Sequence, residues 1–303
     1  MTGSGESGAA FTAESATAVL AEACAGAGLE DAGAELLRLG SNAVFRLAGS
    51  VVVRIGRSAV ELAEQTRTVG VARWLEETGY PAVRLVAGVR QPVVVGGRVV
   101  TFWRLVAGEE RYAGVVEFAE LMRRLHWLEE PESLGLPYVD PLGPTMRRLG
   151  ELVGLADDDR EFLRQRAESL AKRYDALEFV LPFGMIHGDA SVRNALLDDA
   201  GRAVLIDLDG VALGPREWDL VATAMHYERF GWHTRTKYEA FARAYGFDVM
   251  NWYGYPVLAD IREMTMVVWL AQNAGHSEQA DAELGRRLSD LRSGGDRLGW
   301  KPF

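Results

Sequence analysis

The sequence has little cysteine and no long apolar segment. Cys24 is the only cysteine in 303 residues, which excludes an internal disulfide or a cysteine metal cluster and favours a reducing, cytoplasmic compartment. No segment approaches the roughly 18 consecutive apolar residues that a membrane-spanning helix needs. The N-terminal segment has no basic stretch ahead of an apolar core, so it lacks the pattern of a secretory signal. We therefore expect no membrane partner.

Lysine is scarce as well, and the charge is unevenly distributed. The chain contains only Lys172, Lys237 and Lys301, so its first 171 residues have no lysine. With 33 basic and 43 acidic residues the net charge is −10; residues 1–105 hold ten arginines and ten acidic residues, so the whole acidic excess lies in residues 106–303. A net-acidic chain lacks the cations that neutralise nucleic-acid phosphates, so no nucleic-acid partner is expected.

The composition that remains is that of a globular protein. Hydrophobic residues make up 48% and charged residues 25%, which excludes a disordered or fibrous chain. At about 100–200 residues per domain, the length favours two domains. We place them at residues 1–105 and 106–303, because the hydrophobic pattern changes from strand-like to helical near this boundary.

The first domain is predicted to be rich in strands. Short β-branched runs are separated by turn sequences, and one longer segment has apolar residues at helical spacing. The predicted elements are a short helix around Ala16–Ala25, strands at Ala34–Leu39, Ala43–Ala48 and Val51–Ile55, a helix over 59–78, a strand at Val83–Gly88 and a hairpin at Val93–Leu105 about Gly96-Gly97. This order predicts a five-stranded antiparallel sheet with one main helix.

The second domain is predicted to be mostly helical. Helices are expected over 114–128, 158–177 and from Arg216 to Leu291, and the proline-rich segment Pro131–Pro144 is expected to be a loop. Two short strands, at Ala195–Leu197 and Val204–Ile206, interrupt the helical pattern. The whole chain is thus predicted to have an α+β, two-lobe architecture.

Two neighbouring segments carry polar residues suited to phosphoryl transfer. Asp189 and Asn194 lie in a loop before the first short strand, and Asp207 follows the second. Because a hairpin brings its ends together, Asn194 and Asp207 should be neighbours. A carboxylate can accept the proton of a hydroxyl group, and carboxylate and amide oxygens suit Mg²⁺. Each residue alone would more often be a turn residue, but their joint order indicates a site.

The segment from His187 to Asn194, followed by Ile206–Asp209, resembles the signature of the aminoglycoside phosphotransferase family, small-molecule kinases with a protein-kinase-like fold. Similar stretches at Arg73–Pro81, Leu121–His126 and Gly214–Leu220 extend the resemblance over about residues 34–290. By motif match, the resemblance implies ATP and Mg²⁺ as cofactors. It also implies Asp189 as catalytic base and Asn194 and Asp207 as metal ligands.

The phosphate-binding side departs from that family pattern. The turn Gly40-Ser41-Asn42 has a single glycine, and its backbone amides together with Ser41 and Asn42 are predicted to hold phosphate. With no lysine available, Arg54 is predicted to contact the phosphates. Glu64 is the preferred partner of Arg54, with Glu61 as the alternative. Both glutamates are also plausible solvated helix residues.

Other residues have more open roles. The backbone of the crossover that contains Trp103 and Leu105 is expected to contact adenine, although its side chains do not discriminate ATP from GTP. Asp209 is expected either to bind a second metal ion or to hold its loop. Asp219 is expected to brace the catalytic loop from within a helix, and His187 is expected to be structural.

The expected function is an ATP-dependent phosphotransferase that phosphorylates a hydroxyl group of a small molecule. The acidic charge of residues 106–303 fits a cationic antibiotic such as an aminoglycoside. A kinase of choline-like, homoserine-like, sugar or macrolide acceptors and a weakly active nucleotide-binding pseudokinase are the alternatives. A protein kinase is disfavoured because no activation-loop-like segment follows Asp207. The acceptor and the oligomeric state are left open.

Overall fold

The computed structural model describes residues 11–272 and 277–302, and these form two compact units. The first unit comprises Met1–Ala113, Pro131–Leu136 and Arg193–Val211, and the second comprises the segments between and after them. Each unit is therefore built from separate stretches of chain. The sequence-based boundary between residues 105 and 106 concerns functional lobes and stays a prediction.

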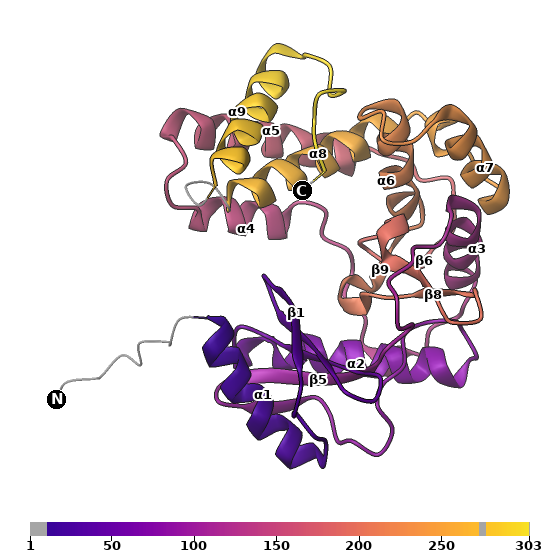
Figure 1. Ribbon diagram of the computed structural model, residues 1–303. Helices are drawn as coiled ribbons and strands as arrows, with labels where there is room; N and C mark the ends of the chain where they lie inside the picture. Colours follow the sequence, from indigo (N-terminus) through magenta and orange to yellow (C-terminus); the bar gives the residue numbers. More distant parts are fainter. Residues whose placement is uncertain (1–10, 273–276, 303) are drawn as a thin grey trace. The chain divides into compact units, whose positions relative to one another are not determined.

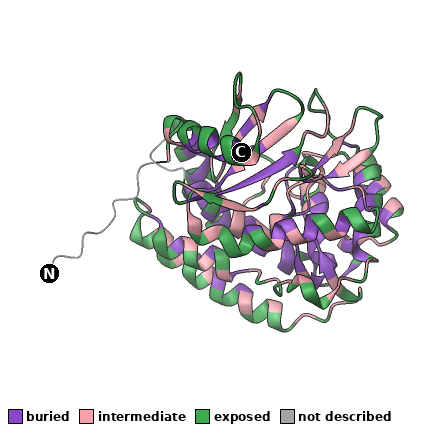
Figure 2. Ribbon diagram, turned by 90° about the horizontal axis from the view of Figure 1, so that it is seen from below, coloured by how far each residue is buried: buried purple, intermediate pink, exposed green. Residues whose placement is uncertain are grey.

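The first unit contains a five-stranded sheet in the order β1-β2-β3-β5-β4, with every neighbouring pair antiparallel. Its strands are β1 (Glu35–Leu39), β2 (Ala43–Leu47), β3 (Val51–Ile55), β4 (Val93–Val95) and β5 (Arg98–Arg104). These bounds confirm the three predicted N-terminal strands and the hairpin about Gly96-Gly97. Figure 2 shows how buried residues gather on strands and on the inner sides of helices.

Two helices belong to the sheet of the first unit (Figure 1). Helix α1 (Ala13–Ala27) buries Leu20 and its neighbours against one sheet face, which includes Phe45 and Val53. Because side chains alternate along a strand, Arg54 points to the opposite face. Helix α2 (Leu62–Glu77) lies on that side, after a short 3₁₀ turn at Ala59–Glu61. The face bearing Arg54 is therefore the one that α2 borders.

The predicted strand at Val83–Gly88 is wrong. In this segment the amide of Val83 donates to the carbonyl of Leu205 at 2.8 Å, whereas the amide of Val86 donates to Phe102 at 3.0 Å. The segment divides its hydrogen bonds between two partners and forms isolated bridges rather than a ladder. The fifth strand of the sheet comes instead from the hairpin, which contributes both β4 and β5.

A second small sheet in the first unit carries two of the predicted site residues at its ends. It is the hairpin of β7 (Ala195–Leu197) and β8 (Ala203–Leu205), with Ala195 paired to Leu205. A 3₁₀ turn at Leu208–Gly210 follows β8. The hairpin is anchored within its unit, because the amide of Ala113 donates to the carbonyl of Ala195 at 2.8 Å.

The second unit is mostly helical, as predicted. Its helices are α3 (Val115–His126), α4 (Gly143–Glu151), α5 (Asp157–Asp175), α6 (Glu217–Glu228), α7 (Arg235–Tyr245), α8 (Tyr255–Ala271) and α9 (Glu278–Ser293). The sequence-based prediction missed α4, which begins inside the expected loop. It also missed the antiparallel pair of β6 (Phe183–Ile186) and β9 (Ala212–Pro215). In the part of the chain that the structure describes, no helix combines the length and apolarity needed to cross a membrane.

Candidate active site

The two predicted metal ligands lie side by side at the base of the β7–β8 hairpin. The amide of Ile206 donates to the carbonyl of Asn194 at 2.9 Å, which continues the hairpin pairing by one step. Asp207 comes next and has a φ of 59°, a left-handed conformation that aspartate tolerates better than most residues. The prediction that Asn194 and Asp207 are neighbours is therefore confirmed, whereas their role as ligands stays a prediction.

The donor set at this position fits a hard divalent cation. Asp207 offers a carboxylate and Asn194 an amide oxygen, the ligand types that Mg²⁺ prefers. Further acidic groups lie close by, since partial burial and then the charge of Asp209 raise the pKa of Glu64. No group of three or more His, Cys, Asp or Glu side chains suited to a metal ion occurs among the described residues, so a bound cation at this position would depend on the amide oxygen of Asn194 as well as on Asp207.

Arg54 lies between the sheet and the segment that follows the hairpin. Its Nη2 is 2.5 Å and its Nη1 3.4 Å from the two carboxylate oxygens of Asp209, and Nη1 is 3.8 Å from Asp207 Oδ1. Burial alone would lower the pKa of Arg54, but Asp209 and Asp207 outweigh it and raise that pKa. The guanidinium therefore stays charged where a phosphate-binding cation was predicted.

The partner of Arg54 differs from the predicted one. The ion pairs of Arg54 in the described chain run to Asp209 and Asp207, and Glu64 contributes only the weakest of the charge effects that raise the pKa of Arg54. The reason lies one turn further along α2, where Thr68 Oγ1 donates to Asp209 Oδ1 at 3.2 Å. Arg54 thus pairs with Asp209 instead of the predicted Glu64. The contacts of Asp209 with Arg54 and Thr68 agree with the expectation that it holds its loop, whereas a second metal ion at Asp209 stays a prediction.

The alternative partner, Glu61, is directed elsewhere. Its carboxylate occupies the space that a Cβ atom at position 56 would take, so the glutamate packs against the backbone at Gly56, just after β3. Glu61 is therefore not the group that holds Arg54.

The predicted phosphate-binding turn between β1 and β2 is closed by its own backbone. The amide of Gly40 donates to the carbonyl of Asn42 at 3.0 Å, and Ser41 is exposed. Arg57 donates to the Gly40 carbonyl through Nε at 3.1 Å and Nη2 at 2.7 Å. Sequence reasoning missed this second cation, although its position just after β3 was a usable signal. The phosphate role of Ser41 and Asn42 stays a prediction.

The predicted adenine-contacting segment is well ordered within the sheet. Trp103 is buried, and its indole N–H donates to Thr101 Oγ1 at 2.8 Å. The amide of Leu105 donates to the carbonyl of Ser50 at 2.9 Å, and that of Arg104 to Arg84 at 2.7 Å. The Trp103 side chain is thus core, and a nucleotide contact by Trp103 or Leu105 stays a prediction for their backbone carbonyls.

The loop that carries Asp189 belongs to the second unit and is held from α6. Asp219 Oδ2 accepts the His187 amide at 2.6 Å, and Oδ1 accepts the Gly188 amide at 2.9 Å. Burial would raise the pKa of Asp219, but the hydrogen bond from His126 and the nearby His187 hold it below its usual value. The expectation that Asp219 braces this loop is confirmed, and His187, fully buried, is consistent with a structural residue.

A second cation reaches the Asp189 loop from α8. Arg262 Nη1 is 3.4 Å from Asp189 Oδ1, and Nη2 donates to the Gly188 carbonyl at 3.1 Å. Sequence reasoning missed Arg262, since 73 residues separate it from Asp189 and no local pattern marks it.

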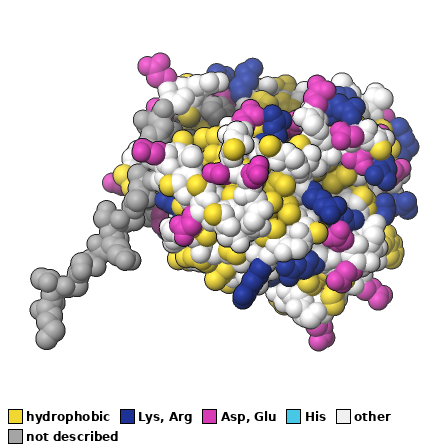
Figure 3. All heavy atoms as spheres, turned by 60° about the horizontal axis from the view of Figure 1, so that its bottom comes forward, with side chains coloured by type: hydrophobic (Ala, Val, Ile, Leu, Met, Phe, Trp, Pro, Cys, Tyr) yellow, Lys and Arg dark blue, Asp and Glu magenta, His cyan; other side chains and the backbone are white. Residues whose placement is uncertain are grey.

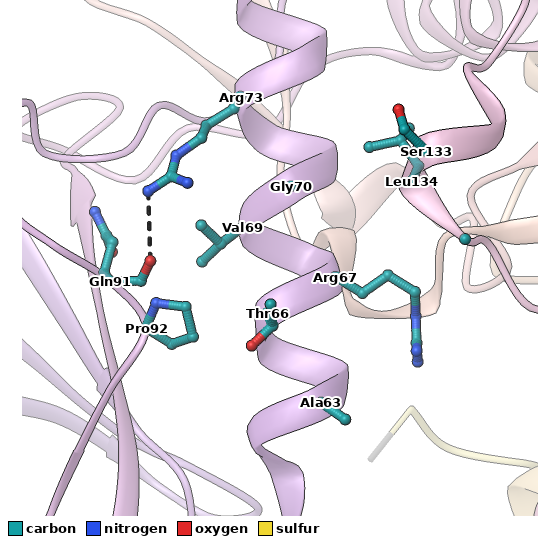
Figure 4. A pocket seen from close by; sticks show the side chains of 11 residues that line it. Ala63, Thr66, Arg67, Val69, Gly70, Arg73, Gln91, Pro92, Ser133 and Leu134 are labelled. Atoms are coloured by element: carbon teal, nitrogen blue, oxygen red, sulfur yellow. Dashed lines mark hydrogen bonds between the residues drawn. The ribbon is translucent and has the colours of Figure 1, made fainter.

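A shallow groove of about 440 Å³ also lies in the first unit, along the outer side of α2 (Figure 4). Its lining includes Thr66, Arg67, Gly70, Arg73 and Leu134. None of the predicted site residues is among the groove's lining residues, so the groove is not the predicted nucleotide site.

The strand-rich unit with a charged β3 arginine, together with a helical unit that carries the Asp189 loop, defines a two-lobe, protein-kinase-like fold. The sequence matches the phosphotransferase enzyme family over residues 34–261. The chain belongs to this family and is a kinase. None of the curated proteins matches it.

Solved structures share this fold at low sequence identity. An amicoumacin kinase in complex with AMP-PNP, Ca²⁺ and amicoumacin is 15% identical, with a TM-score of 0.72 and coverage of 94% of this chain and 95% of the other. A microcompartment-associated aminopropanol kinase is 18% identical, with a TM-score of 0.69 and coverage of 93% and 99%. The aminoglycoside phosphotransferase APH(3'')-Id from Streptomyces rimosus is 22% identical, with a TM-score of 0.57 and coverage of 82% and 98%.

Proposed function

We propose that this protein transfers the γ-phosphoryl group of ATP to a hydroxyl group of a small molecule. The observation that carries the proposal is the cluster of Arg54, Asp207 and Asp209 beside Asn194. It combines a charged guanidinium with oxygen ligands at the base of one hairpin. Asp189 precedes Asn194 by five residues in the sequence, the spacing at which the motif match assigns a catalytic base and a metal ligand.

In the proposed reaction Asp189 accepts the proton of the acceptor hydroxyl. The hydroxyl oxygen forms a bond to the γ-phosphorus while the bond from that phosphorus to the β-phosphate oxygen breaks, and ADP leaves. Arg54 contacts phosphate oxygens with its planar fork, and Asp209 keeps this fork oriented. A magnesium ion held by Asn194 and Asp207 would neutralise phosphate charge.

The acceptor is proposed to be a small molecule with a hydroxyl and an amino group. The similar structures are named as kinases of amicoumacin, of aminopropanol and of aminoglycosides. The acidic excess of residues 106–303 supports an acceptor of positive charge. An antibiotic is one such acceptor, and its phosphorylation would give the protein a role in antibiotic resistance. A small amino alcohol is another.

A panel assay tests this proposal. Purified protein would be incubated with Mg-ATP and, separately, kanamycin, streptomycin, spectinomycin, choline and aminopropanol, while ADP formation is followed. We expect ADP formation to rise above the acceptor-free rate with at least one compound, and the product to gain one phosphate by mass spectrometry. No phosphorylated product from any amino alcohol or aminoglycoside would contradict the proposed acceptor class.

A catalytically weak, mainly nucleotide-binding member of the family is the second candidate. The ion pair of Arg54 with Asp209, and its 3.8 Å approach to Asp207, favour it, because both carboxylates compete with phosphate for the guanidinium. Under this alternative ATP would stabilise the protein against heat, but the wild type would phosphorylate every acceptor slowly, and Asp189→Ala would change that rate little.

A further inference from the structure

Arg262 is the fixed member of an ion pair with Asp189. The side chain of Arg262 is only 12% exposed, whereas that of Asp189 is 70% exposed. One guanidinium nitrogen approaches the Asp189 carboxylate at 3.4 Å, and another donates to the Gly188 carbonyl at 3.1 Å. Arg262 thus contacts both the backbone of the loop, at Gly188, and its functional side chain, Asp189.

The guanidinium is held in place by an aromatic face. The Arg262 Cζ atom lies 4.3 Å from the ring centroid of Trp218, a favourable cation–π distance. The indole N–H of Trp218 donates to the same Gly188 carbonyl at 2.8 Å. Gly188 has a φ of 82°, a left-handed backbone conformation that glycine adopts without strain. Two helices therefore fix one carbonyl beside Asp189.

This arrangement has a cost that packing alone does not explain. The Nε atom of Arg262 is buried and has no hydrogen-bond partner among the described residues. An unsatisfied buried donor destabilises the fold, and a hydrophobic side chain at this position on α8 would avoid that penalty. Costs of this kind concentrate at functional sites.

We propose that Arg262 is a positioning residue for phosphoryl transfer, which keeps the exposed Asp189 carboxylate in the orientation that faces the acceptor hydroxyl. Arg262 does not touch the reacting atoms. Without it, the Asp189 side chain, which is 70% exposed, would lose a contact that restrains its orientation. Misplacement of a reacting group by about 1 Å can cost on the order of 10²-fold in rate.

The test compares Arg262→Ala with the matched control Arg173→Ala. Arg173 also binds a carboxylate on α8, donating to Asp260 at 2.9 Å, but it has no contact with the Asp189 loop among the interactions of the described residues. With the best acceptor of the panel, Arg262→Ala should lower kcat by about 10–100-fold and leave the KM for ATP nearly unchanged. Added millimolar guanidinium, or the variant Arg262→Lys, should restore part of kcat. Arg173→Ala should keep the wild-type kcat.

Two results would overturn the positioning role. One is a kcat of Arg262→Ala equal to that of Arg173→Ala, and the other is a loss that neither guanidinium nor lysine reduces. If Arg262→Ala does not fold, a wild-type kcat in Arg262→Met, which keeps the length of the side chain without its charge, overturns the role as well.

Asp189 is the base only under the proposed function. A second measurement, hydrogen exchange of the loop, therefore tests the contact without relying on catalysis. Hydrogen exchange of the peptide over residues 183–190 should be faster in Arg262→Ala than in Arg173→Ala. If wild type phosphorylates no acceptor, the proposed function fails, and this exchange alone decides whether Arg262 orders the loop. Equal exchange in the two variants overturns the inference.

Discussion

At the scale of single residues, the most informative feature is an arginine where kinases of this kind usually carry a lysine. Arg54 presents two nitrogens to the two oxygens of Asp209, a contact that a lysine ammonium could not make in the same way. Thr68 holds Asp209 from α2. Arg54, the proposed phosphate-binding cation, is thus held by a loop aspartate instead of a helix glutamate.

Replacement of Arg54 should impair the use of ATP. Arg54→Ala is expected to lower kcat/KM for ATP by roughly 10–100-fold, because charge-assisted hydrogen bonds contribute about 1.5–3 kcal/mol, and Arg54→Lys should retain part of the activity. Arg46→Ala is the control, since Arg46 lies on β2 and pairs with Glu35 at 2.6 Å on the surface. A kcat/KM for Arg54→Ala equal to that of Arg46→Ala would show that Arg54 has no phosphate role.

Removal of the Thr68 hydroxyl tests the contact between α2 and Asp209. Thr68→Val keeps the shape of the side chain but removes the hydroxyl, whose single proton is shared between Asp209 Oδ1 and the Glu64 carbonyl, both at 3.2 Å, so we expect a loss of about 1 kcal/mol in the free energy of unfolding. We also expect a severalfold increase in the KM for ATP. Thr66→Val, an exposed neighbour whose hydroxyl bonds only the Leu62 carbonyl among the described contacts, should change neither quantity.

At the scale of elements, α6 and α8 of the second unit prepare the Asp189 loop. Helix α6 supplies Trp218 and Asp219, and α8 supplies Arg262. Two acidic residues of α8 close to Arg262 have a different role. Asp260 and Glu263 form ion pairs with Arg229 at 2.9 and 2.8 Å. One face of α8 therefore stabilises the helical unit while another serves the loop.

Loss of the Asp219 carboxylate should disable the loop. In Asp219→Asn the side chain can no longer accept hydrogen bonds from both His187 and Gly188 amides, and it loses the charge that His126 faces. We expect a decrease of about 3–5 kcal/mol in the free energy of unfolding and a large fall in kcat. Asp248→Asn is the control, because Asp248 accepts the Met250 amide at 3.1 Å at a distant turn. Equal effects of the two variants on kcat would contradict the assigned role.

The elements differ in how far the sequence determined them. The spacing of apolar residues and the turn sequences sufficed to predict β1–β3, the hairpin about Gly96-Gly97 and the main helices, because each of these elements depends on residues that are neighbours in the sequence. Residues Val83–Gly88 looked like a strand but divide their hydrogen bonds between distant partners. The pairs of Arg54 with Asp209 and of Arg262 with Asp189 span 155 and 73 residues. Such pairs arise from tertiary packing, so the sequence predicted roles for Arg54 and Asp189 but not the partner of either residue.

At the scale of the whole molecule, the acidic charge is less decisive than its sum suggests. Within the second unit, Glu263 is fully buried in ion pairs with Arg229 and Arg297. On the face drawn in Figure 3, acidic and basic side chains are interspersed. Acidic side chains such as Glu263 therefore sit in ion pairs, and the net charge of −10 is not gathered into one patch on this face, so the acceptor has to be identified by assay instead of by net charge.

The stability of the fold should depend on pH through His226. Burial first, then His233 and Arg262, lower the pKa of His226 from 6.5 to about 4. An unfolded chain therefore binds this proton more readily than the folded one, so the contribution is present above pH 6.5 and is lost as the pH falls towards 4. Between pH 7 and 5 the free energy of unfolding should decrease by roughly 2 kcal/mol from this group. Urea unfolding of wild type and His226→Phe at both pH values measures this decrease. An equal pH dependence of the two proteins would contradict the contribution assigned to His226.

The central claim is that Asp189 is the base of a phosphoryl transfer, and a single-turnover experiment with Asp189→Asn tests it most directly. Radiolabelled γ-phosphate would be followed from enzyme-bound ATP to the acceptor identified by the panel, and ATP affinity would be measured in parallel. We predict that the rate of transfer falls by roughly 10²–10⁴-fold while the Kd for ATP stays close to the wild-type value. Transfer by Asp189→Asn at the wild-type rate would contradict the account.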